Sequence, residues 1–111
     1  MAFTQRLAYE TIRSVDTSTL SGSYVALGTP LLHPATIVKM VNNSNVLVTV
    51  STDGTNGHDI LPGNSFFLYD VTANLPSSTN AVLMPAGTQY YVSSSAGIGL
   101  VYLVIQYIVQ V

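Results

Sequence analysis

Apolar and polar residues alternate along most of the chain, the period of two that places one face of a β-strand in a core and the other in solvent. Val, Ile, Thr and Tyr, which favour strands, are frequent throughout. Turn formers separate the alternating segments, as in Asn42–Asn45, Asp53-Gly54 and Pro62-Gly63. The pattern predicts strands at 24–27, 35–42, 46–51, 58–61, 64–69, 81–84, 88–93 and 98–111.

A series of about seven or eight short strands with turns between them is typical of an all-β fold. We therefore expect a single-domain antiparallel β-sandwich, jelly-roll-like, over residues 23–111. Segment 1–22 is ambiguous, because Leu7, Ile12 and Val15 suit one face of a helix while Leu7, Tyr9 and Thr11 alternate as in a strand. We favour an extended segment over a long helix, and one hypothesis is an arm that reaches a neighbouring molecule. The alternative is a first strand or helix that packs on its own subunit.

The last predicted strand is apolar on both faces. Val101, Leu103, Ile105, Tyr107, Val109 and Val111 form one face. Leu100, Tyr102, Val104 and Ile108 form the other, which is interrupted only by Gln106 and Gln110. An antiparallel strand normally has one wet face, so the second face needs a cover. We expect a subunit interface at these four residues and a homo-oligomer, the alternative being a long strand that crosses between the sheets.

Charge is scarce in this chain of 111 residues: 7% of residues are charged, where soluble domains average about 25%. Three basic residues cannot neutralise a nucleic-acid footprint, so direct DNA or RNA binding is not expected. Residues 71–111 contain no charge, which again points to a covered surface. There is no cysteine, the N-terminus does not resemble a signal peptide, and run 98–111 is too short for a spanning helix, so no membrane association is expected.

Candidate chemistry is confined to the loop Asp53–Asp59. Its carboxylate and amide oxygens suit calcium, but no glutamate closes a twelve-residue EF-hand loop, so a hairpin turn is the favoured interpretation. His58 and Asp59 are neighbours on a strand and point to opposite faces, so they do not form a catalytic pair. We expect His58 and His33 to be structural. With no nucleophile motif and no metal-ligand spacing, the sequence predicts no enzyme, no cofactor and no metal.

A carbohydrate-binding module is the alternative from another functional class. Such sandwiches present aromatic rings on one face, and the chain has tyrosines that could supply them. The candidates are Tyr69, Tyr90, Tyr91, Tyr102 and Tyr107.

Several segments resemble small structural proteins of tailed-bacteriophage virions. They include Val41–Val46, Val50–Gly54, His58–Phe66, Leu68–Asp70, Met84–Val92 and Gly99–Leu103. The resemblance covers roughly residues 24–105. It implies a non-enzymatic β-sandwich located in the virion, which cements or links other virion proteins and copies of itself at the capsid, neck or tail.

Overall fold

The computed structural model, which describes residues 5–70 and 84–110, arranges its strands in two antiparallel sheets. The large sheet has the order β1-β9-β4-β7, with β2 also paired to β9, and the small sheet has the order β3-β8-β5-β6. The strands of the large sheet are β1 (Gln5–Tyr9), β2 (Arg13–Asp16), β4 (Ala35–Ser44), β7 (Ser65–Asp70) and β9 (Gly99–Gln110). Those of the small sheet are β3 (Val25–Ala26), β5 (Val48–Ser51), β6 (Asp59–Leu61) and β8 (Tyr91–Ser93).

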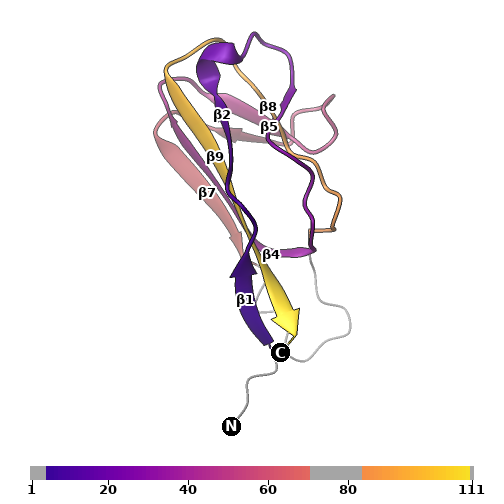
Figure 1. Cartoon of the computed structure of the whole chain (residues 1–111). Helices are drawn as coiled ribbons and strands as arrows, with labels where there is room; N and C mark the ends of the chain where they lie inside the picture. Colours follow the sequence, from indigo (N-terminus) through magenta and orange to yellow (C-terminus); the bar gives the residue numbers. More distant parts are fainter. Residues whose placement is uncertain (1–4, 71–83, 111) are drawn as a thin grey trace.

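The chain passes repeatedly between the two layers. From β2 onward, the large sheet takes β2, β4, β7 and β9, and the small sheet takes β3, β5, β6 and β8. The two layers face each other in the upper half of the molecule (Figure 1). This is the eight-strand arrangement of a jelly roll, so the predicted all-β, single-domain sandwich is confirmed.

Alternate residues of both sheets form the core between the layers. From the large sheet, Met40, Leu103 and Ile105 are completely buried. From the small sheet, Val48 and Val92 meet them and are equally buried. The period of two in the sequence therefore separates core-facing from outward-facing residues, as expected for strands packed on one face.

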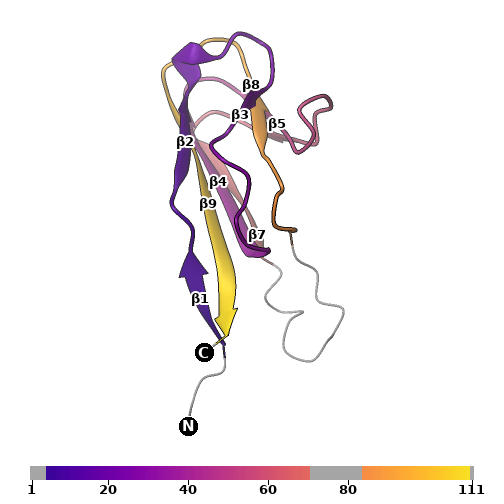
Figure 2. The same cartoon turned by 45° about the vertical axis from the view of Figure 1, so that its right-hand side comes forward.

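Strand β9 is the centre of the large sheet. It pairs with β1 and β2 on one side and with β4 on the other. The end of β9 continues with β1 beyond the small sheet, which makes the molecule long, with extents of 51 × 25 × 20 Å (Figure 2). The predicted strand 98–111 thus corresponds closely to β9.

The N-terminal segment is part of this sheet rather than a free arm. β1 and β2 both pair with β9 of their own chain, and the 3-10 turn η1 (Thr17–Thr19) follows β2. This is the second of the two alternatives, a first strand packed on its own subunit. Residues 1–4 lie outside the described residues, and the next strand after the boundary expected between residues 22 and 23 is β3, from Val25.

Two further boundaries differ from the prediction. The turn expected at 42–45 begins later, because β4 continues through Asn42 to Ser44, both of which are buried. Of the strand expected at 81–84, residues 81–83 lie outside the described residues, and Met84 forms an isolated bridge with Ala35.

Candidate functional site

The four predicted interface residues share the face of β9 that points away from the small sheet. The residues between them, Val101, Leu103 and Ile105, are completely buried in the core. Leu100 is 37% exposed, and the other three are partly exposed. All of β9 belongs to the large sheet, so this strand does not cross between the sheets. The described part of the chain therefore leaves the second apolar face of β9 uncovered.

Neighbouring strands widen this apolar surface. The register places Val41 between Tyr102 and Phe66, and Lys39 between Val104 and Leu68. Phe66 is 65% exposed and Leu68 is 48% exposed. On the other side of β9, Leu7 lies opposite Ile108. We call this surface the outer face; its apolar members are Leu7, Tyr9, Ile37, Val41, Phe66, Leu68, Leu100, Tyr102, Val104 and Ile108.

More than half of the apolar residues of the outer face were not identified from the sequence. The alternation in 64–69 indicated that Phe66 and Leu68 share a side, but nothing in a single sequence indicates which strand lies beside which. Because β7 pairs with β4, and β4 pairs with β9, the outward-facing apolar residues of the three strands form one surface.

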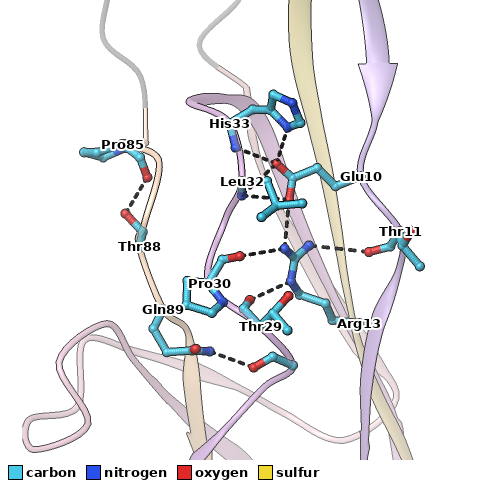
Figure 3. Close-up of polar contacts among 11 residues, drawn as sticks. Glu10, Thr11, Arg13, Thr29, Pro30, Leu32, His33, Pro85, Thr88 and Gln89 are labelled. Atoms are coloured by element: carbon cyan, nitrogen blue, oxygen red, sulfur yellow. Dashed lines mark hydrogen bonds and ion pairs between the residues drawn. The ribbon is translucent and has the colours of Figure 1, made fainter.

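A buried ionic cluster lies on the opposite side of the large sheet from the outer face, at the junction of β1 and β2. The Glu10 side chain is 2% exposed, and its Oε1 accepts a hydrogen bond of 2.8 Å from Nη2 of Arg13, itself 6% exposed. Its Oε2 accepts from the backbone N–H groups of Leu32, at 3.1 Å, and His33, at 2.8 Å (Figure 3). The His33 ring contacts the same oxygen through Nδ1 at 2.9 Å and stacks on Tyr107 with the ring centroids 3.7 Å apart.

The electrostatics of the cluster favour the ionised carboxylate. Burial raises the pKa of Glu10, but hydrogen bonds from the Arg13 and His33 side chains and from the backbone of Leu32 and His33 outweigh it. The pKa of Glu10 is therefore lowered from its ordinary value of 4.5. Arg13 also donates to the carbonyl oxygens of Thr29 and Pro30, so the pair anchors the loop before β4 to the edge of the large sheet.

A one-residue bulge makes this cluster possible. Tyr9 pairs with Gln106 and Arg13 with Leu103, so three residues of the edge strand lie opposite two of β9. In a regular strand, residues three apart point to opposite faces. The extra residue reverses the alternation, and Glu10 and Arg13 both point into the sandwich. Sequence reasoning treated His33 as structural but missed its partner Glu10. The available signal was a Glu and an Arg three apart in a chain with few charges.

The loop at residues 53–59 is a turn held by Asp53. Its Oδ1 accepts from the backbone N–H groups of Thr55 and Asn56, each at 2.8 Å, and these bonds hold the pKa of Asp53 well below its usual range. His58 accepts from the N–H of Thr52 through Nδ1 at 3.0 Å. In the described part of the chain, no group of three His, Asp or Glu is placed to hold a metal ion.

Asp59 has a structural partner on the neighbouring strand rather than His58. Its Oδ2 accepts a hydrogen bond from the hydroxyl of Tyr69, and this bond, with burial, raises the pKa of Tyr69 to about 12. The Tyr69 ring also stacks on Phe67 at 4.7 Å. The contact joins β6 to β7, and so connects the edges of the two sheets.

The tyrosines considered for glycan binding do not form one platform. Tyr90 is buried in the core, and Tyr107 is stacked on His33. Tyr69 lies beside Asp59, while Tyr102 is on the outer face. No specific observation therefore favours the carbohydrate-binding alternative.

Comparison with protein-family models, with curated proteins and with solved structures finds no match. Within residues 5–70 and 84–110, no helix has the length and apolar character to cross a membrane.

Proposed function

We propose that this protein is a non-enzymatic structural component of a tailed-phage virion, in which it links copies of itself and other virion proteins at the capsid, neck or tail. The observation that carries the proposal is the uncovered outer face. Soluble monomers rarely expose continuous apolar surfaces of this kind, and such surfaces mark association sites. Here apolar side chains from β1, β4, β7 and β9 adjoin one another. The described charged residues on the same face are Lys39 within it and Asp16 and Asp70 at its margins.

The energetics suit association rather than isolation. Burying a fully exposed Phe or Leu side chain contributes roughly 1.5–3 kcal/mol, so the exposed fractions of Phe66 and Leu68 contribute about 1 kcal/mol each on contact. The remaining apolar members of the outer face add smaller amounts. Association costs several kcal/mol in lost freedom, which a surface of this composition can offset only when most of it is buried together.

The fold and the buried cluster support the same function. Jelly rolls recur in viral capsid proteins, in lectins and in cupins, so the architecture is compatible with a virion role by analogy. The Glu10–Arg13 pair and its contacts to Leu32 and His33 fix the loop before β4.

The proposal is tested on particles. Virions of the phage that encodes the chain are purified, and the protein is quantified by mass spectrometry in particles assembled with the wild-type chain or with Val104→Asp. We expect the wild-type protein at constant stoichiometry and a strong loss for Val104→Asp, which places a charge in the centre of the outer face. The control is Ile60→Asp, a change of the same kind at a 58% exposed residue of the small sheet.

Both variants are first compared with the wild type by thermal unfolding. Absence of the wild-type protein from purified virions would overturn the proposal. Equal incorporation of Val104→Asp and Ile60→Asp, both folded, would show that the outer face is not the linking surface.

A further inference from the structure

We propose that the outer face docks on a different virion protein, which presents an apolar surface with one carboxylate placed opposite Lys39. The inference deepens the proposed function, on which it rests for the virion partner, by naming the chemistry of the surface that covers the outer face.

Lys39 lies within the outer face and has apolar neighbours on every side. Val104 of β9 and Leu68 of β7 lie directly opposite it in the two ladders. Ile37 and Val41 are the next residues of β4 on the same face. The Lys39 side chain is partly exposed, as expected for a lysine that lays its stem along apolar neighbours and keeps the ammonium group in water. A partner that covers these four neighbours therefore also covers the ammonium group.

The covered ammonium group needs a counterion. Removing a charged group from water is unfavourable unless an opposite charge and hydrogen-bond acceptors replace the water. A carboxylate supplies both. Close pairs of opposite charge inside an interface also fix how the two surfaces are aligned and disfavour partners that lack the complementary charge.

The fold itself does not provide this counterion. Among the described residues, Lys39 takes part in no hydrogen bond and no ion pair. The residues outside the description, 1–4, 71–83 and 111, include no Asp and no Glu. An acidic side chain opposite Lys39 therefore comes from another molecule.

A second copy of the chain is a poor source of that carboxylate. All five acidic side chains of the chain already take part in interactions of their own fold, namely Glu10, Asp16, Asp53, Asp59 and Asp70. A second copy would have to pair Lys39 with one of these engaged groups. Two outer faces packed centre to centre would instead bring two Lys39 ammonium groups together, which like charge disfavours.

The charge pattern also favours a protein over a polyanion. Nucleic acids and anionic lipid surfaces are bound by several cations acting together. The described residues of the outer face include one cation, Lys39, and the acidic Asp16 and Asp70 lie at its margins. The surface that matches this pattern is apolar and carries a single carboxylate, which is a pattern that a protein can present.

Carbodiimide cross-linking tests the contact directly, because Lys39 is the only lysine of the chain. The reagent joins an amine to a carboxylate in contact with it, with loss of water. Purified virions are treated, digested and analysed by mass spectrometry. We expect Lys39 to be joined to an Asp or Glu of a different virion protein. Lys39→Arg keeps the charge but has no amine for this reaction, so it should be incorporated normally and lose the cross-link.

Substitutions at Lys39 test whether its charge matters for assembly. We expect Lys39→Met to be incorporated less than the wild type, and Lys39→Glu to fall by at least about tenfold, because it places like charges together. Arg6→Glu is the control, an equal charge reversal at an exposed residue. Arg6 lies opposite Val109 in the register, on the other side of the sheet from the outer face, so Arg6→Glu should be incorporated normally. Thermal unfolding checks that each variant is folded.

A charge exchange completes the test. Once the cross-link identifies the partner carboxylate, replacing that residue by Lys should restore the incorporation of Lys39→Glu. The absence of any Lys39 cross-link, a cross-link only to a second copy, or full incorporation of Lys39→Glu would overturn the inference. The particle experiment with Val104→Asp separates this failure from that of the proposed function. Loss of Val104→Asp with full incorporation of Lys39→Glu retains the outer face as the linking surface and removes the acidic complement alone.

Discussion

Replacing the Glu10 carboxylate by an amide tests whether the buried cluster stabilises the domain. Glu10→Gln keeps the size of the side chain but substitutes an NH₂ group for one carboxylate oxygen. That group then faces either the guanidinium of Arg13, now 2.8 Å from Oε1, or the backbone N–H groups of Leu32 and His33 near Oε2. In both orientations a donor faces a donor, and the Arg13 charge loses its buried counterion.

The expected loss is large relative to the stability of such a domain. Removing one partner of a buried ion pair costs roughly 3–5 kcal/mol. Single domains are stable by about 5–15 kcal/mol, so Glu10→Gln should lose a substantial fraction of the free energy of unfolding. Arg13→Met should cost a similar amount. The double variant should cost less than the sum of the two by about 1 kcal/mol or more, because neither charge is then left unpaired.

Urea denaturation followed by circular dichroism measures these differences. The midpoint should fall in each single variant, with an unchanged slope against urea. Thr11→Ala, at an exposed neighbouring residue, is the control and should change the stability by less than about 0.5 kcal/mol. A Glu10→Gln loss below about 1 kcal/mol, or strict additivity with Arg13→Met, would refute the stabilising role of the pair.

Three further predictions are checked by urea denaturation or, for Tyr69, by absorbance titration. Because the pKa of Glu10 is lowered from 4.5, the ionised side chain adds to the free energy of unfolding above that pH, and this addition is lost as the pH falls below it. Between pH 7 and pH 3 the free energy of unfolding should therefore fall less in Glu10→Gln than in the wild type, and an equal fall would contradict the lowered pKa. The hydrogen bond to Asp59 raises the pKa of Tyr69 to about 12, so this contact stabilises the fold below pH 10 and less as the pH rises towards 12. In Asp59→Asn, the tyrosinate absorbance of Tyr69 should therefore appear at lower pH. An unchanged titration would contradict the role of Asp59 in raising this pKa. Gly99 has φ +117°, and a Cβ there would collide with the Asn43 carbonyl oxygen, whereas Gly87 has φ +86° with open space around it. In urea denaturation, Gly99→Ala should therefore lower the free energy of unfolding by at least about 2 kcal/mol more than Gly87→Ala. Equal losses would contradict the collision.

The strands were predictable because their signal is local. Alternation in 35–42 separates two faces of the strand regardless of what lies beside them, and in the structure Val38 and Met40 are buried on one of these faces. The segment 88–93 shows the limit of this reasoning. Only Tyr91–Ser93 forms a regular strand, because the preceding residues bond irregularly to the loop before β4, as in the 2.9 Å contact from the Leu31 N–H to the Thr88 carbonyl.

Features that depend on pairing were beyond a single sequence. Nothing local distinguishes an arm from an edge strand over residues 5–16, since the deciding partner, β9, is almost a whole chain length away. The bulge that turns Glu10 and Arg13 to one side is visible only in the register with β9. The apolar second face of β9 was predictable because it lies within one strand, while the place of Phe66 beside it was not, because the two strands are joined only through β4.

The central position of β9 also determines when the domain can fold. β1, β2 and β4 do not pair with one another, and each has β9 as a neighbour. During synthesis, therefore, the N-terminal strands remain without their partner until residues 99–110 have left the ribosome, and closure of the large sheet must wait for contacts that are nearly the full chain apart. Closure of the large sheet consequently follows the synthesis of β9, and the apolar strands made first are exposed to aggregation throughout that interval.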